Sequence, residues 1–388
     1  MKVTLVHNHY RQPGGEDQVF AAEGDLLEAH GHSVTRYAAH NDTLDGTRQL
    51  ALARATVWNG EQYRDLRAVF REARPDVVHV HNTLPLVSPA VYYAARAEGA
   101  AVVQTLHNFR VACVNGLFFR DGHVCEDCLG KLAPWRGVLH ACYRGSRAAS
   151  AAVAAMVGYH KLRGTYREQV DAYITLTDFS REKFVAAGLP ARKLFVKPNF
   201  VYPDPGVGGG HGGYALFVGR LSDEKGVGTL LAAWQRVGAR LPLLIVGDGP
   251  MAAPVAEAAV GGHVTWLGRR PPRDVYELMG AAAVVVIPSE WFETFGRVAV
   301  EAFATGTPVL ASNIGAIAEL VDHRRTGLLF TPGDAEALVD AVAWAISHPA
   351  ELAAMRRAAR AEYEDKYTAE ANYDQLMATY QHALEGRR

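Results

Sequence analysis

The sequence predicts an α/β protein built from two Rossmann-like, doubly wound domains. Short Val, Ile and Leu runs alternate with helix-like segments in both halves of the 388 residues, which is typical of βαβ units around a parallel sheet. Residues 202–213, with two prolines and six glycines, interrupt this alternation near the middle of the chain. We therefore expect one domain over 1–200 and a second over 201–368, joined by a glycine-rich hinge.

The first domain is expected to contain six strands, each a short apolar run. They cover 3–7, 33–37, 77–81, 101–107, 172–176 and 194–197. Helices are expected over 16–29, 91–97 and 180–187, and Asp178 is the predicted cap of the last of these. The sequence thus follows the order strand, helix, strand through most of its first half.

The second domain repeats this pattern, with strands expected over 214–218, 242–247, 263–267, 283–288 and 308–312. From Asp334 onward the chain is rich in Ala and reads as helical. We expect its last segment, about 369–388, to return and pack on the first domain. Ligands of such sheets bind beyond the carboxyl ends of the strands, so chemistry is expected there.

Composition and charge narrow the class of protein. The chain is 49% hydrophobic and 21% charged, which excludes a mostly disordered protein. Its net charge is −1, so no global field draws it to nucleic acid. With no signal-peptide pattern and no run of apolar residues long enough to span a bilayer, the expected location is the cytoplasm.

One local charge field stands out between Lys131 and Arg167, where seven basic residues occur without any Asp or Glu. They are Lys131, Arg136, Arg144, Arg147, Lys161, Arg163 and Arg167. An ordinary solvated face is one interpretation. The other is peripheral contact with anionic lipid, or with a polyprenyl-linked acceptor, at the cytoplasmic face of a membrane.

The segment 289–301 carries the strongest chemical signal. Glu293 is expected in a loop after a strand, and Glu301 on a helix that begins near Phe295 or Gly296. Unpaired amides at a helix start suit a phosphate, and carboxylates accept hydrogen bonds from vicinal hydroxyls. If the whole stretch were helical, the two carboxylates would lie roughly 12 Å apart, about the span of a nucleotide diphosphate sugar. Two solvated glutamates on a helix are the alternative.

A second segment, 218–226, places two cations after a strand. Arg220 ends the strand and a glycine-bounded turn delivers Lys225, so together they can neutralise a diphosphate without a metal. The alternative is an ordinary charged surface loop. Because no Asp-x-Asp pair occurs in these segments, metal-independent chemistry is expected, with no catalytic cofactor.

These motifs, together with Gly14-Gly15-Glu16 after the first strand and His107 after the fourth, resemble the retaining glycosyltransferases of family GT4. The resemblance covers essentially the whole chain. It implies the GT-B fold, in which two Rossmann-like domains face each other across a cleft. A cluster of cysteines marks this chain as a cysteine-containing variant of the pattern.

The resemblance also implies roles on the donor side. Glu293 contacts the hydroxyls of the donor sugar, Glu301 holds the ribose, and Arg220 and Lys225 bind the diphosphate. The other donor-binding positions are Gly14, Gly15, Thr294, Phe295 and Gly296.

On the acceptor side the resemblance implies Glu16, with His107 next to the reacting sugar. Catalytic roles fall to His107, Glu293, Arg220 and Lys225, while the departing diphosphate oxygen takes the acceptor proton. By contrast, His79 and His81 alternate along one strand, as do His7 and His9, and structural packing is the preferred interpretation for both pairs.

The expected reaction is transfer of a hexose or N-acetylhexosamine from a nucleotide-sugar donor, UDP-sugar favoured, to a saccharide or polyprenyl-linked acceptor. Cell-surface polysaccharide or glycolipid assembly is the expected setting. A sugar-nucleotide epimerase of the same fold is the first alternative. A zinc-bearing nucleic-acid-binding protein is the second, and it leaves Glu293 and Glu301 without a purpose.

All four cysteines fall in one insert, about 108–146. They are Cys113, Cys125, Cys128 and Cys142, and the C-x2-C pair has the spacing of a tetrahedral zinc site. A structural zinc ion is the leading hypothesis, with reduced thiols and disulfides as alternatives. The residues between the first two cysteines predict a hairpin that closes on Asp121-Gly122.

Overall fold

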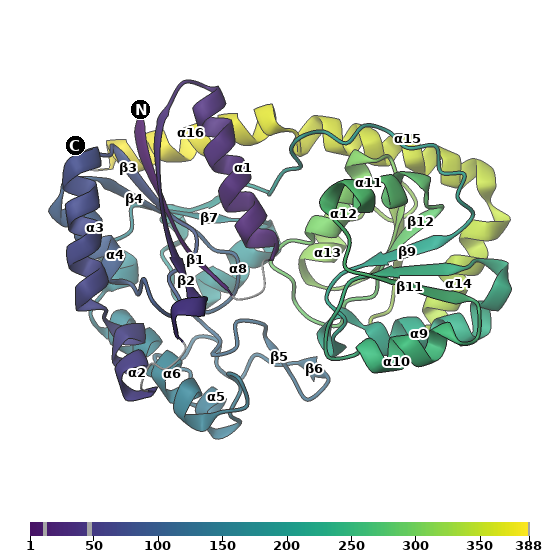
Figure 1. Cartoon of the computed structure of the whole chain (residues 1–388), viewed down its shortest axis with the longest axis horizontal. Helices are drawn as coiled ribbons and strands as arrows, with labels where there is room; N and C mark the ends of the chain where they lie inside the picture. The colour runs from purple at the N-terminus through teal and green to yellow at the C-terminus, as the bar shows by residue number, and fades with distance from the viewer. Residues whose placement is uncertain (11–13, 45–48, 387–388) are drawn as a thin grey trace. The chain divides into compact units, whose positions relative to one another are not determined.

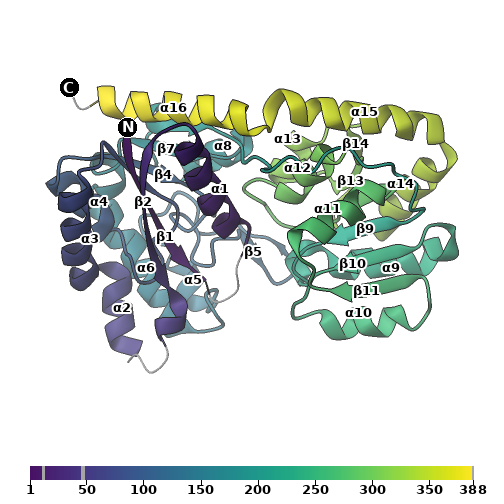
Figure 2. The ribbon, with the colours of Figure 1, turned by 45° about the horizontal axis from the view of Figure 1, so that its top comes forward.

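The computed structural model describes residues 1–10, 14–44 and 49–386 and divides into two compact units. The first comprises 1–118, 125–198 and 372–388, and the second comprises 119–124 and 199–371. Figures 1 and 2 show a parallel sheet flanked by helices in each unit. Among the described residues, no helix is both long and apolar enough to cross a membrane.

The sheet of the first unit has six parallel strands in the order β2-β1-β3-β4-β7-β8. The strands are β1 (Lys2–His9), β2 (Ser33–His40), β3 (Val77–Val80), β4 (Ala101–Thr105), β7 (Ala172–Thr175) and β8 (Leu194–Val196). Every residue of β3, β4 and β7 is buried, as expected for parallel strands covered on both faces. All six predicted strands of this half are present, with ends shifted by one to three residues.

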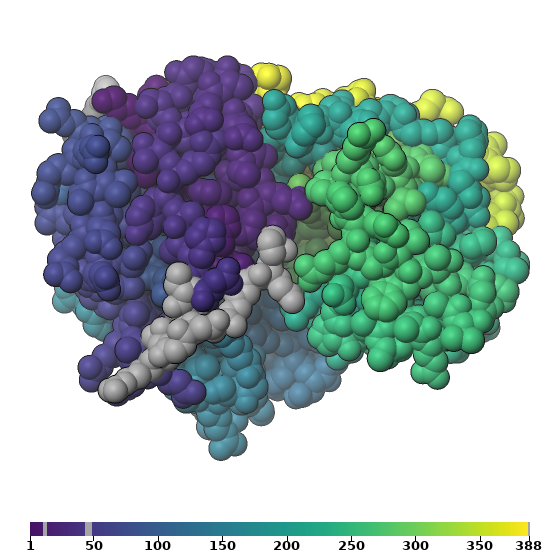
Figure 3. Space-filling view, in the orientation of Figure 1, coloured from purple at the N-terminus to yellow at the C-terminus, as the bar shows by residue number. Residues whose placement is uncertain are grey.

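Helices α1 (Gly15–Ala29), α3 (Gly60–Ala73), α4 (Ala90–Ala97) and α8 (Asp178–Ala186) accompany this sheet. Helices α2 (Gln49–Val57), α5 (Arg136–Leu139), α6 (Arg147–Leu162) and α7 (Thr165–Glu168) belong to the same unit. On the side shown in Figure 3, residues from the first hundred positions, drawn purple to blue, form most of the coloured surface of the first unit. The first predicted helix, 16–29, is α1, which begins one residue earlier.

The predicted cap of α8 is wrong by one residue. Thr177, not Asp178, is its N-cap: the Thr177 side chain accepts a hydrogen bond from the Ser180 amide at 3.1 Å. Asp178 is instead the first helical residue, where a carboxylate favours the positive end of the helix dipole. Both residue types cap helices well, so sequence alone does not distinguish them.

The second unit also has a six-stranded parallel sheet, in the order β11-β10-β9-β12-β13-β14. Its strands are β9 (Ala215–Val218), β10 (Leu243–Val246), β11 (Val264–Gly268), β12 (Val284–Ile287), β13 (Val309–Ser312) and β14 (Gly327–Phe330). The five predicted strands are all present. The sixth, β14, is an edge strand of four residues that was not predicted from the sequence.

The helices of this unit are α9 (Val227–Val237), α10 (Ala252–Ala259), α11 (Pro272–Ala281), α12 (Arg297–Ala304), α13 (Gly315–Leu320), α14 (Ala335–Ser347) and α15 (Pro349–Lys366). The predicted helical region after Asp334 is thus confirmed as α14 and α15, followed by α16 (Ala369–Glu385). Asp334 caps α14 by accepting from the amides of Glu336 and Ala337.

Helix α16 carries the chain back into the first unit, which includes its residues from Asn372 onward. The Asn372 side chain donates to the carbonyl of Pro198 at 2.7 Å, and Leu376 and Tyr380 are fully buried. In both ribbon views α16, in yellow, runs beside the strands of this unit. The C-terminal helix therefore completes the core of the N-terminal half.

The cysteine insert contains the predicted hairpin. Strands β5 (Phe119–Arg120) and β6 (His123–Val124) pair antiparallel, with Asp121 and Gly122 at the turn, both at positive φ. The hairpin groups with the second unit, while the cysteines on either side of it belong to the first.

Candidate functional site

Two loops meet at the carboxyl end of the sheet in the second unit. One follows β9 and carries Lys225 and Gly226; the other follows β12 and carries Glu293. Gly226 has φ +69°, and a Cβ built there would lie 1.8 Å from the carbonyl oxygen of Pro288. Only glycine allows the loops this close approach, which brings the two predicted segments together.

Lys225 and Glu293 form the centre of this site. The Lys225 ammonium lies 2.8 Å from Glu293 Oε1 and 5.3 Å from the centre of the Trp291 ring. The Ser289 hydroxyl donates to the same carboxylate oxygen at 2.6 Å. Burial alone would raise the pKa of Glu293, but the Lys225 charge and the hydrogen bonds hold that pKa below its ordinary value. Glu293 is therefore an ionised carboxylate in a buried setting.

Glu301 lies on α12, one turn after Arg297, and its Oε1 is 2.8 Å from Arg297 Nε. Burial raises the pKa of Glu301 above its ordinary value, and the Arg297 charge offsets only part of this effect. The same pair also faces Tyr276, whose pKa burial raises. Glu301 and Glu293 thus sit in different electrostatic surroundings although both are buried.

The remaining predicted donor residues differ in exposure and in their position relative to α12. Arg220 follows β9 and is exposed. Phe295 is buried beside Tyr367, and α12 begins at Arg297 with Gly296 as its N-cap, one residue later than expected. Glu293 and Thr294 lie in the loop before the helix, so the helical spacing considered from sequence does not apply between Glu293 and Glu301.

In the first unit, the end of β1 meets the start of α1. Asp17 Oδ1 lies 3.0 Å from His7 Nε2 and 2.5 Å from His9 Nδ1, while Asp17 Oδ2 accepts the Gly14 amide at 2.6 Å. Burial lowers the pKa of His7 to about 4, and the pKa of Asp17 falls to about 2 because these hydrogen bonds outweigh its burial. Asp17 therefore fixes the Gly14-Gly15 turn against β1.

Glu16, the predicted acceptor-side residue, is the second residue of α1 and contacts Asn82, which follows β3. Its Oε1 accepts from Asn82 Nδ2 at 3.3 Å. Burial and the neighbouring Asp17 raise the pKa of Glu16 to about 8, while the Arg110 charge opposes this shift. Arg110 also lies 5.1 Å over the ring of Tyr143. Glu16 is thus a carboxyl group that can carry a proton near neutral pH.

His107 follows β4, and its Nε2 lies 3.0 Å from His81 Nδ1, with the two rings stacked. Burial and the neighbouring His81 hold the pKa of His107 well below its ordinary value. The predicted face-sharing of His79 and His81 is confirmed, since their ring centres are 4.4 Å apart. His7 and His9 likewise lie 4.5 Å apart.

Two groups in the described part of the chain have three ligand atoms close enough to hold a metal ion: His7 with His9 and Asp17, and Glu23 with His79 and His81. The four cysteines are not among these groups. They do lie within electrostatic range of one another, since burial and the other three thiols raise the pKa of Cys128 to about 11. The four thiols thus lie in one region, but their sulfur atoms are not arranged closely enough to count as a metal site among the described residues.

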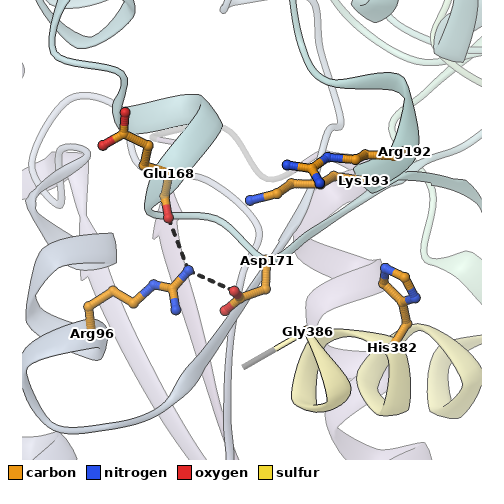
Figure 4. A pocket seen from close by; sticks show the side chains of 7 residues that line it. All are labelled: Arg96, Glu168, Asp171, Arg192, Lys193, His382 and Gly386. Atoms are coloured by element: carbon orange, nitrogen blue, oxygen red, sulfur yellow. Dashed lines mark hydrogen bonds and ion pairs between the residues drawn. The ribbon is translucent and has the colours of Figure 1, made fainter. Parts of the chain in front are cut away.

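A separate cavity of about 520 Å³ opens at the other end of the first sheet. Its lining, labelled in Figure 4, is Arg96, Glu168, Asp171, Arg192, Lys193, His382 and Gly386. The Arg96 guanidinium is held by Asp171 at 2.6 Å and by the Glu168 carbonyl at 3.0 Å, as the dashed lines show. Asp171 and Lys193 precede β7 and β8, so this cavity lies at the amino ends of the strands. It is therefore at the opposite end of the sheet from Glu16 and His107, which follow the carboxyl ends of β1 and β4.

Sequence reasoning missed the partners of the predicted residues. Ser289, Trp291 and Arg297 flank the Glu293 and Glu301 motif but were given no role. In the first unit, Asp17 and Glu23 follow the Gly14-Gly15 turn on α1, and Lys197 directly follows β8. The signal that was available for Asp17 was its position three residues after a helix cap.

Family comparisons cover most of the chain. The family described as Glycosyl transferase 4-like domain matches residues 14–199, and that described as Glycosyl transferases group 1 matches 210–362. The chain is 34% identical over 181 residues to D-inositol 3-phosphate glycosyltransferase of Segniliparus rotundus, spanning 44% of this chain and 40% of that protein. It is 28% identical over 350 residues to glycogen synthase of Mycobacterium tuberculosis, spanning 87% of this chain and 75% of that protein. Over most of its length it therefore matches curated sugar-transferring enzymes, although it spans less than half of the first.

Solved structures agree on the fold. Sucrose-phosphate synthase of Thermosynechococcus elongatus superimposes with a TM-score of 0.73 at 19% identity, covering 97% of this chain and 98% of that one. HepE of Anabaena, solved in complex with UDP, gives 0.69 at 19% identity, covering 98% of this chain and all of the other. Both sheets of this chain are thus those of the GT-B fold.

Proposed function

This chain belongs to the GT4-type glycosyltransferases, and we propose that it transfers a sugar from a UDP-sugar to an acceptor hydroxyl with retention of the anomeric configuration. The partly buried Lys225–Glu293 pair carries the proposal, because it places one cation and one carboxylate at 2.8 Å where the carboxyl ends of β9 and β12 meet. The UDP complex of HepE supports the choice of donor nucleotide.

In the proposed reaction, Lys225 and Arg220 bind the diphosphate. Lys225 is held by Glu293 and Trp291, so it is positioned before the donor arrives, whereas Arg220 is exposed and supplies a second charge. As the bond between sugar and phosphate breaks, negative charge develops on the leaving oxygen. Preorganised cations that meet this charge lower the barrier, and loss of one such group costs about 3–4 kcal/mol. The reaction then needs no metal ion.

The two glutamates have separate roles in this proposal. Glu293, ionised beside Lys225, accepts hydrogen bonds from the hydroxyls of the donor sugar and favours the positive charge that develops on its ring. Glu301 accepts hydrogen bonds from the two ribose hydroxyls, and Arg297 keeps it oriented along α12. The pKa of Glu293 is lowered and that of Glu301 is raised. This difference fits the division of roles, because only Glu293 would face a developing positive charge.

The acceptor is proposed to bind the first unit, beside Glu16 and His107. The leaving diphosphate oxygen takes the acceptor proton, and His107, neutral because of its lowered pKa, hydrogen-bonds the sugar. We propose a hexose or N-acetylhexosamine as the transferred group, and a saccharide or polyprenyl-linked acceptor in cell-surface polysaccharide or glycolipid assembly. The epimerase alternative has no use for an acceptor site.

A thermal-shift panel with UDP, GDP, ADP and TDP and their sugars tests the donor site. A ligand at about 100 times its Kd adds roughly 2.7 kcal/mol of stability, which corresponds to a shift of several degrees. We expect UDP to raise the apparent Tm of the wild type, and Glu301→Ala to lose most of that shift. Turnover of the matching UDP-sugar should persist in EDTA.

The catalytic part of the proposal is tested with Lys225→Ala, Glu293→Gln and His107→Ala. The first two are each expected to lower kcat by about 100-fold or more, as for loss of a charge-stabilising group. Lys366→Ala is the matched control, because Lys366 is exposed and pairs only with Glu362 among the described residues. Near wild-type turnover in Lys225→Ala would show that the site is misplaced.

We also propose peripheral membrane contact, through a basic–apolar patch of the first unit. Its exposed apolar residues are Leu132, Trp135, Leu139, Tyr159 and Leu162, with exposed fractions of 45–72%, and its exposed basic residues are Lys131, Arg136, Arg144, Arg147 and Arg163. Helices α5 and α6 pack together, and Leu132–Ala133 lies against Gly158 of α6. In both ribbon views these helices lie side by side in the first unit. Apolar side chains among cations fit an anionic bilayer.

For the four cysteines we propose a structural zinc ion bound by Cys113, Cys125, Cys128 and Cys142. The gathered thiols and the C-x2-C spacing support this, and zinc binding would displace the proton that burial favours on the Cys128 thiol. Protein purified in reducing buffer is expected to contain one zinc per chain by elemental analysis. Cys125→Ser with Cys128→Ser should lose it.

Two results would contradict this zinc site. Zinc that persists in the cysteine variant but is lost in His79→Gln would assign the metal to the histidine group instead. A mass lower by two or four hydrogens under non-reducing conditions would show disulfides.

A further inference from the structure

Behind His107, a row of buried polar groups crosses the first unit. It starts at Lys197 after β8, continues through Glu23 on α1 and His81 after β3, and reaches His107 after β4. All four residues belong to one compact unit. None of the first three has a role in the reaction described above.

The row begins with a fully buried ion pair. Lys197 is 1% exposed and Glu23 is 0% exposed, and Lys197 Nζ lies 2.5 Å from Glu23 Oε1. The same ammonium donates to the Asn372 side chain of α16 at 3.1 Å. Burial would raise the pKa of Glu23, but the Lys197 charge and His81 hold that pKa well below its ordinary value. Glu23 is therefore ionised, and its charge is balanced by Lys197.

The second oxygen of Glu23 determines the protonation of His81. Glu23 Oε2 lies 3.3 Å from His81 Nε2, and neither atom has a hydrogen-bond partner of standard geometry in the described part of the chain. A nitrogen lone pair facing a carboxylate oxygen would be repelled, so Nε2 of His81 carries its proton. Because Lys197 already balances Glu23, a second proton on this ring would be an uncompensated buried charge.

The tautomer of His81 then determines the tautomer of His107. With its proton on Nε2, a neutral His81 presents a lone pair at Nδ1, 3.0 Å from Nε2 of His107. That distance requires His107 to donate from Nε2. The neutral His107 ring, whose pKa lies well below its ordinary value, has one proton and therefore keeps a lone pair at Nδ1.

We propose that Glu23, His81 and Lys197 are positioning residues that hold His107 as its Nε2-protonated tautomer, with Nδ1 as a hydrogen-bond acceptor for a sugar hydroxyl. The role of Nδ1 as a hydrogen-bond acceptor for a sugar hydroxyl rests on the proposed function, whereas the assignment of the tautomer does not. A metal ion at Glu23, His79 and His81 is the competing use of this cluster. The Lys197 ammonium against Glu23 opposes it, and His79 already bonds Tyr380 and Thr105.

The tautomers can be read directly from long-range ¹H–¹⁵N spectra of the full chain labelled at histidine nitrogens. His81→Asn and His107→Asn assign the two rings. We expect both rings as neutral Nε2–H tautomers in the wild type at neutral pH. A charged His81, or an Nδ1–H tautomer of His107, would overturn the proposal.

Kinetics of Glu23 variants then test whether the tautomer matters. Glu23→Gln can turn its amide N–H toward His81, which would reverse both tautomers. The expected result is a kcat lower by about tenfold or more with little change in the KM for the UDP-sugar, as when an orienting partner is lost. Glu23→Leu combined with Lys197→Met removes both charges, so it keeps the apparent Tm closer to that of the wild type while kcat stays low.

The matched control is His79→Gln, which alters a buried histidine of the same cluster that does not contact His107 in any described hydrogen bond. Its kcat should stay within about threefold of the wild type even if its Tm falls. Wild-type kcat in the double variant would show that the row only stabilises the fold. Full activity of His107→Ala would instead refute the role of His107, and the spectra would still report the tautomer.

Discussion

At the scale of single residues, three glutamates show how partners decide what a carboxyl group can do. Glu293 has Lys225 within 2.8 Å and is held ionised. Glu301 has Arg297 at the same distance, yet burial dominates and raises its pKa. Glu16 sits beside Asp17, and its pKa rises to about 8. One side-chain type thus provides an anion beside a lysine, a buried carboxyl group with a raised pKa and a group that titrates near neutral pH.

The raised pKa of Glu16 predicts a stability that falls with pH. The folded protein keeps this proton up to a pKa of about 8, whereas the unfolded chain releases it near 4.5. The contribution is therefore fully present below about pH 4.5 and is lost as the pH rises through about 8. Glu16→Gln mimics the protonated form, so its apparent Tm should rise relative to the wild type between pH 5 and pH 9.

Differential scanning calorimetry at matched ionic strength measures this difference. Glu61→Gln is the control, because Glu61 is an exposed residue in the first turn of α3. Parallel pH profiles of wild type and Glu16→Gln would show that Glu16 is ionised in the folded protein at neutral pH.

Sequence reasoning located the residues that carry recognisable motifs, and the structure brings Lys225 and Glu293 together as expected. It did not find Glu23, Lys197 or Ser289. Glu23 looks like any helix glutamate, because its partners are 174 and 58 residues away in sequence and only the fold brings them together. Long-range pairing of this kind leaves no local pattern to detect.

At the scale of elements, one glycine controls how the loops after β9 and β12 meet. Gly226 precedes α9 in a left-handed conformation. A Cβ added to it would lie 1.8 Å from the Pro288 carbonyl oxygen. Any side chain there must push the β12 loop away. Lys225 and Glu293 lie on the two loops that would separate.

Gly226→Ala is therefore expected to lower stability by about 2 kcal/mol or more, from backbone strain and displacement of the loop. It should also weaken the stabilisation by UDP. Gly228→Ala, two residues later and on the exposed side of α9, has nothing within 4 Å of the added Cβ and should be neutral or stabilising by up to about 1 kcal/mol. Equal Tm values for the two variants would contradict the close approach.

The elements themselves were predictable where periodicity is strong. Eleven of the twelve sheet strands follow from apolar runs, and the hairpin follows from Asp121-Gly122. Strand β14 was missed although other strands of four residues were found, and the cap of α8 was misplaced because Thr177 and Asp178 are adjacent residues that both cap helices. The errors lie at short edge strands and at helix ends, where tertiary context decides.

At the scale of the whole molecule, the basic–apolar patch and the proposed membrane contact predict binding to anionic vesicles. In co-sedimentation with vesicles, binding should increase with the anionic lipid fraction and fall with salt. Trp135→Ala with Leu162→Ala is expected to lower the affinity by about tenfold or more, because both side chains lose apolar contact with the bilayer.

Val260→Ala with Ile346→Ala serves as the matched control, since these residues are also exposed and apolar but lie in the second unit. Vesicle binding that does not depend on anionic lipid, or that falls equally in the control, would remove the basis for this surface.

The return of α16 to the first unit bears on the order in which the protein is made. A ribosome finishes residues 199–371 of the second unit before it adds Asn372, Leu376 and Tyr380, which the core of the first unit requires. The N-terminal half, although synthesised first, can thus complete its fold only after α16 has been synthesised. A nascent chain cut short before Asn372 would keep the second unit while the unit that holds His107 stays unfinished.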